Sequence, residues 1–241
     1  MPASRPAEPT GPARDRLVVA IDGPSGSGKS TVSRRVALRL GLDYLDTGAM
    51  YRALTWWVLD QGVDPGDSAS VARLALALPL ERSGGPADPR VAVDGTDVTA
   101  AIRETRITEL VSRIAMNLEV RAELVRRQRE VAQAGHVVIE GRDITTVVAP
   151  DAPVRVLLTA SEAARLARRA LDVHGSDDPT AVAATRDQVV RRDADDSTVA
   201  AFTDAAEGVT VIDSSAQTVD ETVDAVLALV AAVGLSSSRL S

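Results

Sequence analysis

Short apolar runs alternate along the chain with longer segments in which apolar residues recur every three or four positions. Residues 17–21 form an unbroken apolar run, which is typical of a strand buried on both faces. Val32, Val36 and Leu40 follow at intervals of four, and Gly41 acts as a helix stop. Further strand-like segments are residues 41–46, 137–139, 154–158 and 209–212. This alternation predicts an α/β fold, with a parallel β-sheet core flanked by helices.

Acidic residues stand at the ends of these apolar runs. They are Asp22, Asp46, Glu140 and Asp213. Functional groups of parallel sheets collect at the carboxyl ends of the strands, so we expect a site at this edge.

The segment between the first strand and the first helix carries a phosphate-binding pattern. It reads Gly23-Pro24-Ser25-Gly26-Ser27-Gly28-Lys29-Ser30 and continues with Thr31. Its three glycines can adopt φ > 0, so the loop can curl and point its N–H groups at an anion. Lys29 adds a positive charge for the β- and γ-phosphates, and the Ser30 hydroxyl can ligate Mg²⁺. This P-loop predicts a bound nucleoside triphosphate with Mg²⁺ as cofactor, facing the N-terminus of the helix.

Two stretches interrupt the α/β alternation. Residues 78–102 are rich in Pro and Gly, and residues 90–95 resemble half of a hairpin that turns at Asp94-Gly95. They predict an inserted small antiparallel β unit, which from the residues alone is best interpreted as a surface insertion. A helix rich in charge is expected to follow, from about Thr105 to Ala134.

The second stretch, residues 161–196, concentrates arginines directly after a strand. Arg165, Arg168 and Arg169 share one helix face, and three more arginines follow a polar break at residues 174–179: Arg186, Arg191 and Arg192. A solvated helix pair would account for them. Beside a P-loop, we favour a mobile helical lid that brings its arginines over the phosphates.

Composition limits the function classes. The formal net charge of −7 argues against a general nucleic-acid or anionic-membrane binder. The chain has no Cys, and nothing near His136 or His174 completes a metal site, so both are expected on the surface or in loops. No apolar stretch approaches the ~18 residues of a membrane span. Residues 1–16 lack the apolar centre of a signal peptide, so we expect a disordered tail and a cytoplasmic protein.

Four motifs together carry a family resemblance. They are the P-loop with its flanks at 21–31, Leu-Asp-Thr-Gly-Ala-Met-Tyr-Arg at 45–52, Glu-Gly-Arg-Asp-Ile-Thr-Thr-Val-Val at 140–148, and Arg-Arg-Asp at 191–193 with Asp-Ser-Thr at 196–198. Their order and spacing resemble the bacterial cytidylate (CMP) kinase family over about residues 17–230. The resemblance implies a P-loop kinase fold and transfer of the γ-phosphoryl group of ATP to CMP or dCMP. It also changes the interpretation of the β insertion from a surface insertion to a substrate domain.

The resemblance implies an organisation of the chain as well. The kinase domain is expected over residues 17–235, with a core at 17–60, 103–160 and 205–232. The nucleoside-monophosphate-binding insertion is expected at about 61–102 and the arginine-rich lid at about 161–204. The family implies small nucleotides as the only partners, and we expect a monomer that binds neither nucleic acid nor membrane.

Roles follow position by position from the same resemblance. Thr47, Arg52 and Arg142 match groups that hold the CMP phosphate. Arg121, Asp143 and Ser112 match groups that recognise the cytosine edge, where a carboxylate accepts from N4 and a guanidinium donates to N3 or O2. Asp196 matches a ribose-binding carboxylate, and Arg192 a lid arginine near the transferring phosphoryl group. Together the predicted catalytic residues are Lys29, Arg142 and Arg192; the ATP site is residues 23–31 with Arg165 and Arg169; and the metal ligand is Ser30.

One position departs from the family pattern. Val199 follows Asp196-Ser197-Thr198 where the family has a substrate-contacting Arg. Three alternatives stay open at this point. They are another P-loop small-molecule kinase (acting on UMP, AMP, dephospho-coenzyme A or a hydroxyl acceptor such as shikimate), a nucleotide-gated switch that hydrolyses ATP slowly, and a structural protein with a vestigial nucleotide site. The base-recognising Arg121 and Asp143 argue against the first, and the intact Lys29 and Ser30 against the last.

Overall fold

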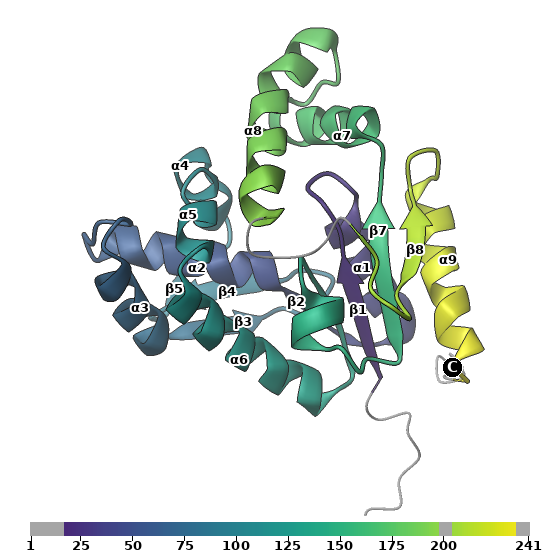
Figure 1. The fold of residues 1–241 in the computed structure, drawn as a ribbon, viewed down its shortest axis with the longest axis horizontal. Helices are drawn as coiled ribbons and strands as arrows, with labels where there is room; N and C mark the ends of the chain where they lie inside the picture. Colours follow the sequence, from purple (N-terminus) through teal and green to yellow (C-terminus); the bar gives the residue numbers. More distant parts are fainter. Residues whose placement is uncertain (1–16, 198–203, 235–241) are drawn as a thin grey trace, which may run out of the picture.

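A five-stranded parallel sheet forms the centre of the molecule (Figure 1), as the apolar pattern predicts. The computed structural model describes residues 17–197 and 204–234. The sheet order is β2-β6-β1-β7-β8. Its strands are β1 (Val18–Asp22), β2 (Asp43–Asp46), β6 (Val137–Gly141), β7 (Val154–Thr159) and β8 (Thr210–Asp213). All five residues of β1, the central strand, are buried, which accounts for its unbroken apolar run.

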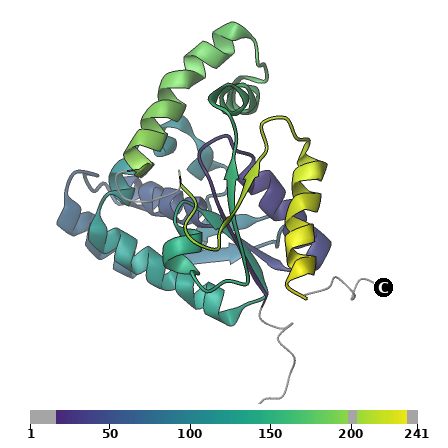
Figure 2. The same ribbon diagram turned by 45° about the vertical axis from the view of Figure 1, so that its right-hand side comes forward.

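Helices cover both faces of this sheet. Val19 and Ile21 of β1 belong to the apolar cluster that includes residues of α1 (Lys29–Leu40) and α9 (Val219–Ala232). Val18 and Ala20 belong to the opposite cluster, with residues of α2 (Thr47–Asp60) and α6 (Leu118–Ala134). Because side chains alternate along a strand, one strand serves two cores. Figure 2 shows α9, in yellow, and α6, in teal, on opposite sides of the sheet.

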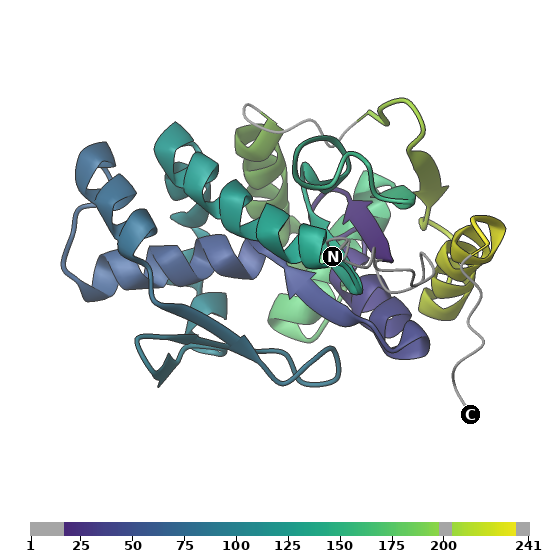
Figure 3. The same ribbon diagram turned by 90° about the horizontal axis from the view of Figure 1, so that it is seen from below.

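The predicted antiparallel unit is present. It comprises α3 (Ser68–Ala77), β3 (Leu80–Ser83), β4 (Arg90–Val93), β5 (Thr96–Asp97) and the short turn η2 (Ala101–Arg103). The β4–β5 turn falls at Asp94-Gly95, whose φ values of 49° and 72° suit a tight hairpin. The small sheet lies below α2 in the view of Figure 3. Arg34 on α1 donates to the backbone oxygens of Pro86 and Ala87 at 3.0 and 2.8 Å, which ties the β3–β4 loop to the core.

The single helix expected from Thr105 to Ala134 is wrong. The segment folds as α4 (Thr105–Thr108), α5 (Val111–Ala115) and α6. Asn117 breaks the last two apart, because its backbone is extended and its side chain accepts from the N–H groups of Glu119 and Val120. An N-cap asparagine of this kind starts a new helix. The charged segment that the sequence suggested as one helix therefore spans a helix boundary.

The arginine-rich stretch forms two helices above the carboxyl edge of the sheet (Figure 1). They are α7 (Glu162–His174) and α8 (Pro179–Ser197), which pack against each other. The Ser161 side chain caps α7, and Gly175, with a φ of 70°, ends it. The predicted tail at 1–16, the last part of the predicted lid and Val199 lie outside the described residues, as do the side chains of Arg191, Arg192 and Asp196.

Candidate nucleotide-binding site

The P-loop has the predicted curled geometry between β1 and α1. Gly26 and Gly28 have φ values of 77° and 87°, which glycine adopts most readily. A Cβ on Gly26 would lie 2.6 Å from the backbone oxygen of Arg165, so only glycine lets α7 approach this closely. Gly23 is required for a similar reason, because a Cβ there would lie 2.2 Å from the backbone oxygen of Leu158. Lys29 begins α1, and its Nζ donates to the backbone oxygen of Pro24 at 3.2 Å.

A cavity of about 790 Å³ opens beside this loop. The P-loop, the start of α2, the insertion, α6, the end of β6 and α7 all line it. It brings together most of the predicted site, namely Ser25, Gly26, Gly28, Lys29, Ser30, Thr31, Thr47, Arg52, Arg121, Arg142, Asp143 and Arg169. Residues from six separate segments therefore meet in one space large enough for a nucleotide.

Other predicted residues do not line the cavity. Gly23, Pro24 and Ser27 belong to the P-loop but do not line the cavity, and Arg165 contacts the loop from α7. Ser112 is buried in α5, although its neighbours Val111 and Ala115 are lining residues.

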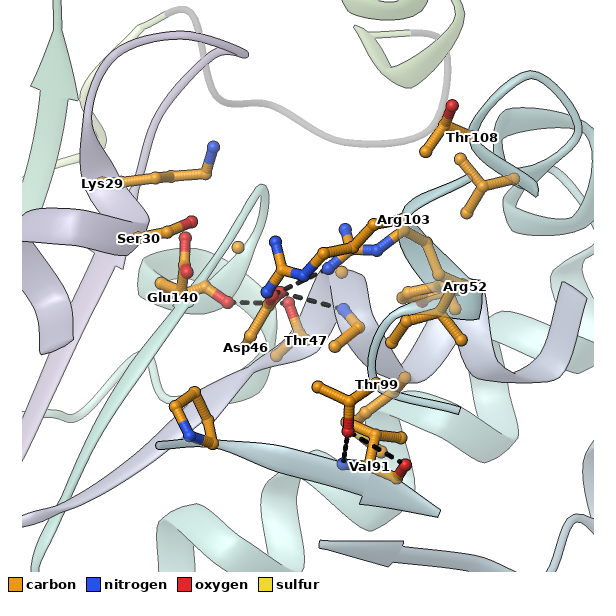
Figure 4. A pocket seen from close by; sticks show the side chains of 18 of the residues that line it. Lys29, Ser30, Asp46, Thr47, Arg52, Val91, Thr99, Arg103, Thr108 and Glu140 are labelled. Atoms are coloured by element: carbon orange, nitrogen blue, oxygen red, sulfur yellow. Dashed lines mark hydrogen bonds and ion pairs between the residues drawn. The ribbon is translucent and has the colours of Figure 1, made fainter. Parts of the chain in front are cut away.

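The start of α2 holds two of the predicted phosphate ligands. Asp46 caps this helix, because its Oδ1 accepts from the N–H of Ala49 at 2.9 Å. Its other oxygen pairs with Nη2 of Arg52 at 2.8 Å. The Thr47 hydroxyl donates to the backbone oxygen of Glu140 at 2.8 Å, so β6 and α2 are joined at the floor of the cavity. Figure 4 shows these side chains gathered beside Lys29 and Ser30.

A cluster of cations faces the same region. Arg103, at the end of η2, points toward Arg52 and Asp46 (Figure 4), and Arg169 comes from α7. Burial lowers the pKa of Arg169, and repulsion from Arg52 and Arg103 lowers it further, against an opposing effect of Asp172. The Nε atom of Arg52 is buried without a hydrogen-bond partner among the described residues. Converging guanidinium groups of this kind are the arrangement that holds phosphate in other proteins.

No motif in the sequence pointed to Arg103. It enters the cavity only because η2 turns the chain back toward α2 after the hairpin, so a tertiary contact, and not a local pattern, places it there.

Arg121 and Asp143 form a buried ion pair at the cavity wall. Their side chains are 15% and 10% exposed. Burial raises the pKa of the Asp143 carboxyl, and the Arg121 guanidinium opposes that shift. The pair places a carboxylate acceptor next to guanidinium donors at the cavity wall.

Glu140 is the most enclosed acid of the cavity, with only 2% of its surface exposed. The Tyr44 hydroxyl donates to its Oε1 at 2.5 Å, and the Ser30 hydroxyl lies beside it (Figure 4). Burial and the neighbouring Asp46 raise the pKa of Glu140, while Lys29 and these two hydroxyls oppose the shift. Glu140, Asp46 and Ser30 thus supply hard oxygen ligands of the type that Mg²⁺ accepts.

Asp193 links the lid helix α8 to the P-loop. Its Oδ1 accepts from the N–H of Ser25 at 3.0 Å and lies 3.4 Å from Nη2 of Arg142. Its Oδ2 pairs with Nη1 of Arg165, which also donates to the backbone oxygen of Ser25 at 3.1 Å. Arg142 in turn donates to the backbone oxygen of Gly23. These contacts explain why Arg165 lies against the loop and outside the cavity.

The remaining acids at strand ends have other tasks. Asp22 is buried and accepts from the N–H groups of Ile144 and Thr145, both at 2.8 Å, so it fixes the turn after β6. Asp213 is exposed and accepts from Ser215.

His136 and His174 are exposed, as predicted. Within residues 17–197 and 204–234, no group of three or more acids and histidines could hold a metal ion, and no helix is long and apolar enough to cross a bilayer.

The fold and the cavity together define a P-loop kinase: a phosphate loop on a parallel sheet faces a second anion site under a helical lid. The family model for cytidylate kinase matches residues 19–232. The cytidylate kinase of Cutibacterium acnes is 50% identical over 89% of this chain and 96% of that protein. Those of Streptomyces griseus and Corynebacterium glutamicum are both 46% identical, covering 90% and 92% of this chain and 94% and 98% of the relatives. The chain belongs to the cytidylate kinase family.

Proposed function

We propose that this chain transfers the γ-phosphoryl group of ATP to CMP or dCMP, giving ADP and CDP or dCDP. One observation carries the proposal: a single cavity joins the P-loop to the Arg52 and Arg103 cations and to the Arg121–Asp143 pair. A donor triphosphate and an acceptor monophosphate can therefore meet end to end. Membership of the cytidylate kinase family supports the same reaction.

The acceptor needs no dedicated base. The second pKa of a phosphate monoester is about 6, so the attacking oxygen of CMP is already ionised at pH 7. A new bond forms between this oxygen and the γ-phosphorus, and the bond from that phosphorus to the bridging oxygen of ADP breaks. The residues of this chain act by alignment and by stabilising negative charge.

Each part of the cavity has a proposed task. Lys29 and the P-loop amides hold the β- and γ-phosphates of ATP. Thr47, Arg52 and Arg103 hold the CMP phosphate, with Arg142 and Arg169 between the two substrates. Asp143 accepts from the cytosine N4 amino group and Arg121 donates to N3 or O2, whereas the O4 of uracil would meet the Asp143 carboxylate with no proton between them. Arg192 and Asp196 keep their predicted lid roles in this proposal.

The oxygen donors around Ser30 fit Mg²⁺. Ser30 would hold the ion, with Glu140 and Asp46 behind it. When bound, Mg²⁺ neutralises charge on the transferring phosphates. We also propose a cytoplasmic monomer, since the reaction draws on ATP and all the proposed site residues come from one chain.

Product analysis tests the proposal. Incubation with ATP, Mg²⁺ and CMP should give CDP and ADP in equal amounts by ³¹P NMR, with no free phosphate. Release of phosphate without CDP would contradict the proposal and would favour an ATP-hydrolysing switch.

A further inference from the structure

Tyr44 and Glu140 meet across two neighbouring strands. In the parallel β2–β6 pair, Asp46 lies opposite Glu140 and Tyr44 lies opposite Val138. Tyr44 is therefore the diagonal neighbour of Glu140 on the same face, a spacing that an aromatic side chain can span. Its hydroxyl donates to Oε1 of Glu140 at 2.5 Å, and both residues line the cavity.

The Glu140 carboxylate needs such a partner. It is almost fully buried, and its strand neighbour Asp46 is also acidic. Two hydroxyls lie beside it: that of Tyr44, which donates to it, and that of Ser30 (Figure 4). A buried carboxylate that loses a hydrogen bond either changes position or recruits another donor. The Ser30 hydroxyl is the predicted metal ligand. The Tyr44 hydroxyl is therefore the one that can hold the Glu140 carboxylate in place.

We propose that Tyr44 is a positioning residue for the magnesium site, because its hydroxyl fixes the Glu140 carboxylate beside the Ser30 hydroxyl. This inference rests on the proposed function, in which Mg²⁺ is held at these oxygens. Tyr44 acts through Glu140 and does not itself bind the ion. A tyrosine hydroxyl is neutral, so it orients the carboxylate without cancelling the charge that attracts the cation. Loss of such a supporting hydrogen bond typically weakens metal binding by about 10- to 100-fold.

The test is Tyr44→Phe, which removes one oxygen and keeps the ring that packs against the apolar core. Free Mn²⁺ is counted by electron paramagnetic resonance in solutions of the enzyme with ADP, against ADP alone. We expect the Mn²⁺ affinity of the enzyme–ADP complex to fall by about tenfold. The Mg²⁺ concentration for half-maximal rate should rise by a similar factor, while the KM for CMP at saturating Mg²⁺ stays the same. Unchanged Mn²⁺ affinity with a lower Tm would overturn the proposal and leave Tyr44 a packing residue.

A double-variant cycle tests the route through Glu140. Glu140→Gln should weaken Mn²⁺ binding by itself, because it removes the charge. If Tyr44 acts through this carboxylate, adding Tyr44→Phe to Glu140→Gln should cause no further loss. Losses that multiply in the double variant would contradict the inference.

The two proposals can fail separately. Mn²⁺ binding in the presence of ADP needs no acceptor, so it tests Tyr44 whatever the second substrate is. Absence of CMP-dependent ADP formation in the unaltered enzyme would overturn the proposed function and leave the Mn²⁺ comparison intact.

Discussion

The carboxylate of Asp193 accepts a hydrogen bond from the backbone N–H of Ser25 at 3.0 Å, although 168 positions separate the two residues. An N–H group of the P-loop is thereby engaged by an acid of the lid, and the same carboxylate faces Arg142 and Arg165. A negative group at this place competes with the phosphates of ATP for the same donors.

Asp193→Asn should therefore strengthen binding of a non-hydrolysable ATP analogue. The amide keeps the shape of the side chain and removes the charge, so we expect a gain of up to about tenfold, the equivalent of roughly 1.4 kcal/mol. Isothermal titration calorimetry without CMP measures it. The matched control is Asp177→Asn, which removes an exposed charge from the same lid and should change nothing. Weaker binding in Asp193→Asn would show that Asp193 holds the two arginines in place for the phosphate.

Lys29 is the only lysine among the 241 residues, which makes its role directly measurable. Lys29→Met should lower kcat by more than about 100-fold, because a charge that stabilises the transferring phosphoryl group is lost. Far-ultraviolet circular dichroism should stay the same. In the unaltered protein, an amine-reactive reagent should modify this side chain, and saturating ATP should protect it. Labelling that ATP does not slow would contradict the assignment.

Arg103→Met should raise the KM for CMP by about 10- to 100-fold, the loss expected for one charge-assisted hydrogen bond of roughly 1.5–3 kcal/mol. The affinity for ATP should change little, since Arg103 lies on the acceptor side of the cavity. Arg106→Met is the matched control, because Arg106 is exposed and does not line the cavity, although its ion-pair partner Glu104 does. Steady-state kinetics with CMP varied at saturating ATP measures both variants, and equal effects in the two would count against a phosphate contact.

Glu123 stabilises the fold away from the site. Its carboxylate pairs with Arg126 at 2.8 Å and with Arg127 at 2.6 Å. Arg127 also donates to the backbone oxygen of Leu78 at 2.8 Å, just beyond the end of α3. Glu123→Gln should lower the free energy of unfolding by about 1–3 kcal/mol, as measured by urea titration. Glu130→Gln, in an exposed pair with Arg126, should change it by less than about 0.5 kcal/mol.

The same pairs make this contribution dependent on pH. They lower the pKa of Glu123 from 4.5 to about 2. A lowered carboxyl pKa gives stability that is fully present above the unfolded value and is lost as the pH falls through the folded one. The difference in stability between the unaltered protein and Glu123→Gln should therefore shrink between about pH 4.5 and pH 2. A difference that stays constant over this range would contradict the assignment.

The sequence was sufficient for features that local patterns determine. The five strands, the P-loop and the Asp94-Gly95 hairpin follow from periodicity and from glycine positions. The helix boundary at Asn117 was missed, because charged residues occur on both sides of it and the N-cap role of its side chain was not recognised.

Local sequence patterns did not predict the contacts between segments that are distant in the chain. Arg103 enters the cavity through a turn that follows the hairpin, and Asp193 reaches Ser25 only because α8 packs back over the P-loop. The contact between Tyr44 and Glu140 depends on β2 and β6 being neighbours, which no local pattern specifies.

Asp143→Asn tests base recognition within the site. An amide can donate a hydrogen bond to the O4 of uracil, which a carboxylate cannot. The ratio of kcat/KM for CMP to that for UMP should therefore fall by at least about tenfold, the equivalent of roughly 1.4 kcal/mol. Equal losses on both acceptors would show that Asp143 orients the site without choosing the base.

The most direct test of the central claim is a panel of acceptors. Coupled ADP-release assays of the unaltered enzyme with ATP and Mg²⁺ compare CMP, dCMP, UMP and AMP. If the Arg121–Asp143 pair recognises the cytosine edge as proposed, CMP and dCMP should exceed UMP and AMP by more than about 100-fold in kcat/KM. Equal rates with all four acceptors, or ADP release that no acceptor stimulates, would contradict the account.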